Sequence, residues 1–164
     1  MIKTLIASAI LMTSISGFAA TSINDFIGTY RLADKKVEGE TFCFQQITIS
    51  QEDDGTIGIY REDTSYGPMI NAELNGSPRK NSGSHGEAMS SRKGKDSVTL
   101  KNDILTFEYS GTTSLLGVPV ARESDTISAK LAQGGKALAV TRTTFEGPVA
   151  GIGKKGKALC AYTR

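Results

Sequence analysis

Apolar and polar residues alternate along most of the chain, and a period of two is typical of strands that bury one face. The alternation predicts strands at Ile27–Leu32, Thr41–Ser50 and Thr56–Arg61. Asp53–Gly55 separates the last two, and Asp and Gly tolerate the positive φ that a tight hairpin turn requires. The apolar spacing of an amphipathic helix is nearly absent, so the pattern indicates an all-β fold.

The second half of the chain continues in hairpins. Leu115–Val120 is apolar but interrupted by Gly and Pro, so it suits an edge or a rim better than a central strand. Further strands are predicted at Met69–Leu74, Ser97–Leu100, Ile104–Tyr109, Asp125–Ala132, Lys136–Phe145 and Ala158–Thr163, with turns at Asn75–Gly76, Lys101–Asp103 and Gly134–Gly135.

Two polar segments break the alternation. Ser77–Asp96 holds three Gly, five Ser and five basic residues, with almost nothing to bury. A loop of this size in a compact domain is usually functional or disordered. Gly147–Lys157 is rich in Gly and Lys and is also predicted to be a loop.

The strands number about eight to nine and follow one another in hairpins without a crossover helix, which excludes a parallel βαβ fold. A long antiparallel meander must protect its edges, and closing into a barrel removes them. We therefore predict an antiparallel meander closed into a β-barrel, with a Greek-key sandwich as the alternative.

The first residues have the three regions of a secretory signal peptide. Lys3 supplies a positive start, an apolar run begins at Leu5, and Gly17 and Ala19 place small residues before a cleavage site after Ala19. The apolar run is shorter than the roughly 20 residues that a transmembrane helix needs. We expect residues 1–19 to be a signal peptide, residues 20–164 to form one domain, and the product to be periplasmic or secreted without a transmembrane segment.

Export to an oxidising compartment allows the two cysteines, Cys43 and Cys160, to pair. Both lie in apolar, strand-like surroundings, and their number is even. A disulfide is the favoured interpretation, and two buried free thiols are the alternative. Closing so long a loop would contribute on the order of 4–5 kcal/mol in the chain-entropy model.

Composition argues against nucleic-acid binding, histidine-based catalysis and metal binding. The 164 residues include 19 Lys and Arg against 17 Asp and Glu, a formal net charge of +2, too balanced for a general nucleic-acid binder. The single histidine, His85, lies in a polar stretch that would not hold a catalytic base in place. One His and two Cys predict no metal site, and Asp53 and Asp54 lack the alternating ligands of a calcium loop. We expect no catalytic residue, no metal and no cofactor.

The segment Gly151–Gly156 matches the dinucleotide fingerprint G-x-G-x-x-G. That fingerprint needs a helix after it, because the helix N-terminus supplies the amides that hold phosphate. The residues that follow are instead predicted to be a strand, so the match is rejected.

Basic residues gather in the two predicted loops. They are explained by solubility, because exposed charge is the default for loops. The sharper hypothesis is a rim that binds a phosphate, an acidic glycan or an acidic partner. The candidate rim residues are Arg79, Lys80, Arg92, Lys93, Lys95, Lys154, Lys155 and Lys157.

The segment Asp25–Leu32 resembles the opening of calycins, the superfamily of lipocalins and fatty-acid-binding proteins. Their first strand carries Phe-x-Gly-x-Trp, and Phe26, Gly28 and Tyr30 match it with Tyr in place of Trp. The resemblance implies that Tyr30 plugs the closed end of a barrel against an Arg from a late strand, which would be Arg142 or Arg164. It also implies a bridge from an early strand to the C-terminus, as Cys43 and Cys160 would form.

Two functions are carried forward. The first is an exported, monomeric, non-catalytic binding protein that holds a small apolar or amphipathic ligand, because barrels of about eight strands can enclose one. The second is a protein-interaction module, such as an inhibitor of a secreted hydrolase, that contacts its partner through the 77–96 loop. Enzymatic activity comes third, because no nucleophile and base can be recognised. Candidate ligand-binding residues are Ile47, Ile49, Ile57, Ile59, Leu105, Phe107, Ile127, Leu138 and Val140.

Overall fold

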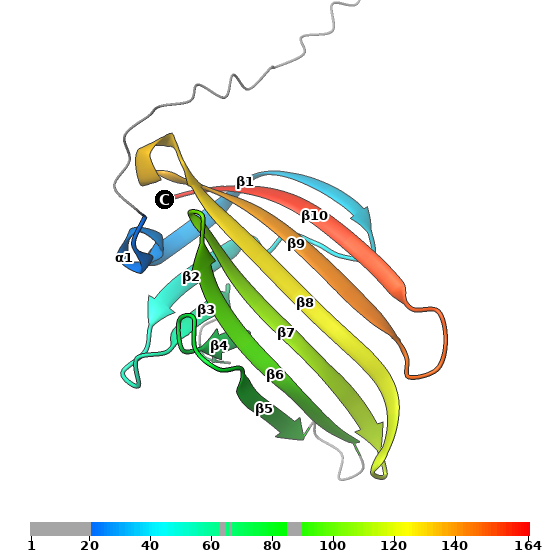
Figure 1. The fold of residues 1–164 in the computed structure, drawn as a ribbon. Helices are drawn as coiled ribbons and strands as arrows, with labels where there is room; N and C mark the ends of the chain where they lie inside the picture. Colours follow the sequence, from blue (N-terminus) through cyan, green and yellow to red (C-terminus); the bar gives the residue numbers. More distant parts are fainter. Residues whose placement is uncertain (1–20, 63–64, 66, 85–89) are drawn as a thin grey trace, which may run out of the picture.

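The computed structural model of the chain describes residues 21–62, 65, 67–84 and 90–164. It contains an antiparallel sheet of ten strands in the order β4-β3-β2-β1-β10-β9-β8-β7-β6-β5, so consecutive strands are neighbours except β4 and β5, which form the two edges, and β1 pairs with β10 (Figure 1). The elements are α1 (Ile23–Phe26), β1 (Gly28–Gly39), β2 (Gln46–Gln51), β3 (Ile57–Arg61), β4 (Ile70–Ala72), β5 (Arg79–Ser84), β6 (Ser90–Lys101), β7 (Ile104–Leu115), β8 (Val118–Ala132), the 3-10 turn η2 (Gln133–Gly135), β9 (Ala137–Pro148) and β10 (Lys154–Thr163).

The sheet curls until its first strands meet β6. Leu74, just after β4, forms an isolated parallel bridge with Val98 of β6. The Asn75 backbone N–H donates to the Val98 carbonyl at 2.8 Å, and the Leu100 N–H donates to the Asn75 side chain at 2.9 Å. The predicted meander is therefore confirmed as a nearly closed barrel, with ten strands where about eight to nine were expected.

Alternation decides which side chains enter the barrel. On β10, Gly156, Ala158, Cys160 and Tyr162 are buried and the residues between them are exposed. The inward side chains of all the long strands join one apolar cluster, in which Phe26, Tyr30, Phe107 and Tyr162 are the largest members. Burial raises the pKa of Tyr162 to about 12, and its hydroxyl donates to the Phe44 carbonyl.

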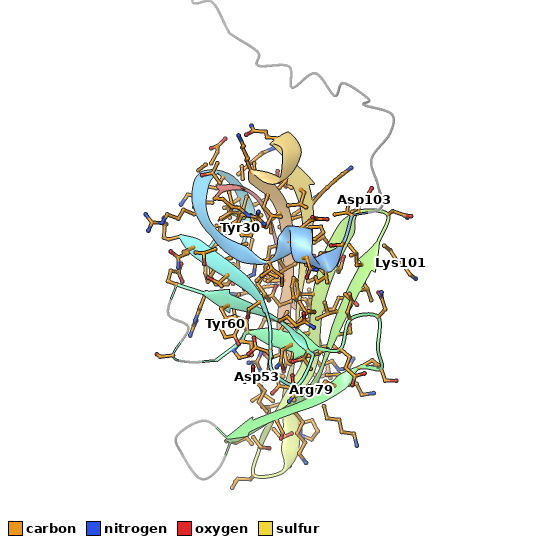
Figure 2. All side chains as sticks on the ribbon, turned by 90° about the vertical axis from the view of Figure 1, so that its left-hand side faces the viewer. Tyr30, Asp53, Tyr60, Arg79, Lys101 and Asp103 are labelled. Atoms are coloured by element: carbon orange, nitrogen blue, oxygen red, sulfur yellow. A yellow bond between two sulfur atoms is a disulfide. The ribbon has the colours of Figure 1, made fainter. Side chains whose placement is uncertain are left out.

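Because the strands meander, successive turns fall at alternate ends of the barrel. The helix end carries α1, the β6–β7 turn, η2 and the C-terminus, as Figure 1 shows. The loop end carries the segment between β1 and β2 and the turns of β7–β8 and β9–β10. In Figure 2, Asp103 marks the helix end and Tyr30 lies in the same half of the barrel.

The helix end is held by Arg164. Its guanidinium donates to the carbonyls of Asp25 and Ile27 and to the Tyr30 hydroxyl, at 2.6, 3.0 and 2.7 Å. It also lies 5.0 Å from the centre of the Tyr30 ring. A Cβ at Gly28 would come within 3.3 Å of Arg164 Nε. Of the two arginines that the calycin resemblance left open, Arg164 is the one that packs on Tyr30.

Several local predictions need correction. The described residues of segment 77–96 are mostly strand and not loop: β5 pairs with β6 from Arg79–Asp96 to Ser84–Ser91. The predicted loop Gly147–Lys157 shrinks to residues 149–153, because β9 runs to Pro148 and β10 begins at Lys154. In both places the polar and glycine residues are themselves part of strands. They pair because the neighbouring hairpins continue the strand pairing beyond the apolar core. The short helix α1 was not predicted.

Other local predictions are confirmed, and two concern residues that the structure does not describe. The turns at Asp53–Gly55 and Gly134–Gly135 are present between paired strands. Leu115–Val120 forms the rim, as expected, but as the tip of two central strands. The predicted signal peptide and His85 lie outside the described residues.

Cys43 and Cys160 form the expected disulfide, with 5.8 Å between their Cα atoms. The bridge ties the segment before β2 to the inner face of β10. Such a bond is typical of proteins that fold in an oxidising compartment outside the cytoplasm.

Candidate binding site at the loop end

The nine residues predicted to contact a ligand all lie inside the barrel, in the packed apolar cluster. Their side chains are between 0% and 5% exposed. Packing of this kind is what an apolar core needs for stability whether or not a ligand enters. That these residues contact a ligand stays a prediction.

The inner face changes character toward the loop end. On β8 the inward residues Ile127 and Ala129 are buried, but the next two inward positions are Asp125 and Glu123. Asp125 pairs with Arg142 of the adjacent strand β9, and Glu123 pairs with Arg92 of β6, across β7. This part of the inner face, around Glu123 and Asp125, is therefore polar and only partly buried, and is here called the polar floor.

Arg142 and Asp125 form the more buried pair. Arg142 Nη2 lies 2.6 Å from Asp125 Oδ2, and Nε donates to both carboxylate oxygens. The guanidinium also lies 4.7 Å and 4.5 Å from the ring centres of Phe42 and Phe44, and its Nη1 donates to the Phe42 carbonyl. The Phe42 ring covers this pair and is itself 54% exposed, so it forms an aromatic wall at the mouth of the barrel.

Arg92 and Glu123 form the second pair. Two Arg92 nitrogens contact the two Glu123 oxygens at 2.5 and 2.8 Å, and Arg92 Nε also donates to the Tyr109 hydroxyl. The Arg92 guanidinium lies 4.2 Å from the centre of the Tyr109 ring. Although burial opposes a charge here, the contacts to Glu123 and Tyr109 raise the pKa of Arg92.

Glycines make room for the Tyr109 ring. Gly94 and Gly111 are paired across β6 and β7, and a Cβ at either position would come closer than 2.5 Å to Tyr109 atoms. The ring therefore lies flat between the glycine pair and Arg92. Burial is the main cause that raises the pKa of the Tyr109 hydroxyl.

Asp96 is a buried carboxylate at the seam of the barrel. It accepts hydrogen bonds from the Asn71 backbone N–H at 3.2 Å and from the Asn81 side chain at 3.2 and 3.4 Å. Burial raises the pKa of Asp96, against the effect of these donors. Through these hydrogen bonds Asp96 links β4, β5 and β6.

The eight residues of the predicted basic rim do not form one surface, because some are held in ion pairs and the others lie on the outer face of the sheet. Arg92 faces inward, Arg79 pairs with Asp54 at 3.2 Å, and Lys154 pairs with Glu40 at 2.8 Å. The alternation of the strands places the other five on the outer face. They are Lys80, Lys93, Lys95, Lys155 and Lys157.

Two features of the loop end were missed. Arg122 joins the outer-face lysines, because it pairs with Thr112, which pairs with Lys93. Exposed aliphatic side chains also gather on the two turns, with Leu116 72% and Ile152 99% exposed. The apolar run Leu115–Val120 was visible in the sequence, but its exposure depends on where the hairpin ends.

Two hollows of about 460 and 500 Å³ are open to solvent and lie against the sheet. Their linings include outward side chains such as Leu159 and Ser128 in one and Thr126 and Thr143 in the other. Within the described residues, no group of three or more His, Cys, Asp or Glu side chains could hold a metal ion. None of the helices in that part of the chain is long and apolar enough to cross a bilayer.

Comparison with known proteins finds no matching family model, no matching curated protein and no matching solved structure. The calycin resemblance therefore depends on the barrel topology and on the contacts of Phe26, Gly28, Tyr30 and Arg164.

Proposed function

We propose that the chain is an exported, non-catalytic binding protein of the lipocalin-like type that holds a small amphipathic molecule at the loop end of its barrel. The observation that carries the proposal is the change along the inner face. The helix half is filled by apolar side chains, whereas the loop half has a polar floor beside a half-exposed aromatic ring.

This arrangement suits a ligand with an apolar and a polar part. The apolar part would lie against Phe42, whose ring is 54% exposed beside the Arg142–Asp125 pair. The polar part would meet Thr113 and the Arg92–Glu123 pair, which is partly open to solvent. Because each arginine is already neutralised by a carboxylate, hydrogen bonding and not net charge would select the polar group.

The test is ligand binding by protein purified without denaturation. Native mass spectrometry should show a co-purified small molecule, and an apolar dye such as Nile red should bind saturably. Phe42→Ala should weaken dye binding roughly tenfold, because it removes most of the aromatic contact. The matched control is Leu159→Ala, which removes a similarly exposed side chain from the outer face. Absence of both co-purified ligand and saturable dye binding would contradict the proposal.

A second candidate function is the hydrolase inhibitor, now with the β5–β6 hairpin in place of the expected loop. The observation that favours it is that β5 pairs only with β6 and lies at the edge of the sheet. An open edge can accept a strand from a partner. Inhibition of secreted proteases or glycosidases in a panel assay, weakened by Lys80→Glu, would support this function.

A further inference from the structure

The loop end has a surface that the interior binding site does not explain. Five aliphatic side chains on two neighbouring turns are exposed: Leu115, Leu116, Val118, Val120 and Ile152, here called the apolar tips. The Val149 N–H donates to the Val120 carbonyl at 3.2 Å, so the two turns are tied together. Figure 1 shows both turns at the end opposite α1.

The backbone conformation of the β7–β8 turn does not favour the residue found there. Leu116 has φ 51°, a left-handed conformation that is uncommon for a bulky side chain. Asn or Gly would adopt it at lower cost. An exposed leucine in this conformation gains neither burial nor backbone stability, so its presence points to a contact outside the barrel.

Five cations lie behind the tips on the outer face: Lys80, Lys93, Lys95, Arg122 and Lys155, here called the cationic patch. The pairing register arranges them in two rows across the sheet. One row runs Lys80, Lys95, Ser110, Ser124, Phe145, Lys155, and the other runs Lys93, Thr112, Arg122. The two rows contain no carboxylate, and none of the five cations forms an ion pair with a carboxylate in the described part of the chain. Lys80 and Lys95 are direct cross-strand neighbours, an arrangement that costs stability unless an anion lies between them.

The spacing of these two surfaces matches a lipid interface. Arg122 lies two residues from Val120, roughly 7 Å along the strand, and Thr112 beside Lys93 lies four residues from Leu116, roughly 13 Å. Apolar groups of interfacial proteins enter the bilayer by roughly 5–10 Å. With the tips at that depth, the row of Lys93 and Arg122 lies at the level of the lipid phosphates, and the row of Lys80, Lys95 and Lys155 lies two residues farther from the bilayer.

We propose that the loop end docks onto an anionic lipid bilayer, with the apolar tips inserted among the acyl chains and the cationic patch on the headgroup phosphates. A bilayer fits better than a protein partner because the tips are protruding and aliphatic. Contacts that dominate protein interfaces are enriched in Trp, Tyr and Arg, whereas Leu and Val are under-represented. This docking does not depend on the interior ligand.

The test is flotation of residues 21–164 with lipid vesicles. These residues contain every helix and strand that the structure describes, and omitting the first twenty, which hold the apolar run, keeps that run from binding lipid itself. The protein should float with vesicles of phosphatidylcholine and phosphatidylglycerol, and much less with phosphatidylcholine alone. High salt should weaken flotation.

Two variants separate the contributions. Leu116→Asn with Ile152→Asn should lower partitioning at least tenfold, because two inserted aliphatic side chains are lost. Lys93→Gln with Arg122→Gln should lower it roughly thirtyfold on anionic vesicles only, since each cation near such a surface contributes roughly fivefold. The matched control, Ile104→Asn with Lys101→Gln at the helix end, should behave as the unchanged protein. Thermal unfolding confirms that each variant is folded.

Fluorescence gives an independent readout, because the chain contains no Trp. In Ile152→Trp the single emission band should shift to the blue with anionic vesicles, whereas Ile104→Trp should not shift. Failure to float, equal loss in the helix-end control, or displacement by inorganic phosphate alone would overturn the proposal. Phe42→Ala should leave flotation unchanged, so failure of the ligand site and failure of the docking surface can be told apart.

Discussion

The two ends of the barrel use different residues in turns of similar geometry. At the helix end the β6–β7 turn is Asn102–Asp103, with φ of 51° and 60°, and both residue types tolerate positive φ. At the loop end the β7–β8 turn is Leu116–Gly117, with φ of 51° and 81°. The first turn agrees with what backbone stability favours, and the second does not. The comparison agrees with a helix end shaped by stability and with the proposal that the loop end contacts another molecule.

Arginines show the same contrast. Arg164 at the helix end donates to two backbone carbonyls and a tyrosine hydroxyl, all of them uncharged, and so ties the end of β10 to α1 and the start of β1. At the loop end, Arg92 and Arg142 pair with Glu123 and Asp125 on the inner face. An ion pair adds little net stability when partly exposed, but it holds polar groups in a fixed arrangement.

The largest expected effect tests the stability of the helix end. Tyr30→Ala should lower the free energy of unfolding by about 3–5 kcal/mol, because a fully buried ring leaves a cavity. Phe42→Ala, at the loop end, should lower it by about 1 kcal/mol or less, since half of that ring already faces solvent. Urea denaturation followed by circular dichroism measures both.

A conservative variant at the same position is the control. Tyr30→Phe keeps the ring and loses the hydroxyl, which donates to the Phe26 carbonyl and accepts from Arg164, so a loss of about 1–2 kcal/mol is expected. Equal losses for Tyr30→Ala and Phe42→Ala would remove the distinction between the two ends.

The second prediction concerns the Arg142–Asp125 pair of the polar floor. Asp125→Ala should cost about 2 kcal/mol by leaving the largely buried Arg142 guanidinium without its carboxylate. The double variant Asp125→Leu with Arg142→Met should recover most of that loss, because an apolar pair of similar size replaces the ion pair. Differential scanning calorimetry compares the three proteins. A double variant no more stable than Asp125→Ala would show that Arg142 contributes through its contacts with Phe42 and Phe44.

The fold could be predicted from the sequence because alternation fixes which side chains face inward. All nine interior positions named from the pattern are buried, and Asp53–Gly55 turns where Asp and Gly allow it. The pairing of Cys43 with Cys160 followed from the predicted export and from the even number of cysteines. These features depend on local chemistry and on one face being buried.

The candidate site could not be predicted in the same way. The Arg142–Asp125 pair joins two strands, and which arginine meets which carboxylate depends on the register of β8 and β9. Residues 77–96 lack apolar alternation because β5 and β6 extend beyond the core, so the pattern predicted a loop. The exposure of Leu116 depends on where the hairpin ends relative to the core. Each of these is a property of the closed sheet and not of a local segment.

The third prediction concerns pH and the seam. Because burial raises the pKa of Asp96 in the folded state, the folded protein binds this proton more tightly than the unfolded chain. The contribution of Asp96 is therefore most favourable at low pH and is lost as pH rises from the ordinary value of 3.8 through the raised folded value. Asp96→Asn should be more stable than the unchanged protein at pH 7, by on the order of 1 kcal/mol.

Stability measured from pH 3 to pH 7 checks this sign. The advantage of Asp96→Asn should shrink as pH falls, whereas Asp96→Ala should be destabilised throughout because the Asn71 N–H loses its acceptor. An Asn variant that is less stable at pH 7, with a deficit that grows as pH rises, would mean that the ionised carboxylate is favoured at the seam.

The smallest expected effect bears directly on the two turns. Leu116→Asn should raise the free energy of unfolding by about 0.5–1 kcal/mol, because Asn adopts the left-handed conformation at lower cost than Leu. The reciprocal change Asn102→Leu, at the same φ in the helix-end turn, should lower it by a similar amount. Chemical denaturation of both variants gives the sign. If the signs are opposite while Leu116→Asn also loses vesicle binding, the leucine is retained at the loop end against its cost to stability. Equal signs would mean that the two turns obey the same rule and that Leu116 needs no partner to explain it.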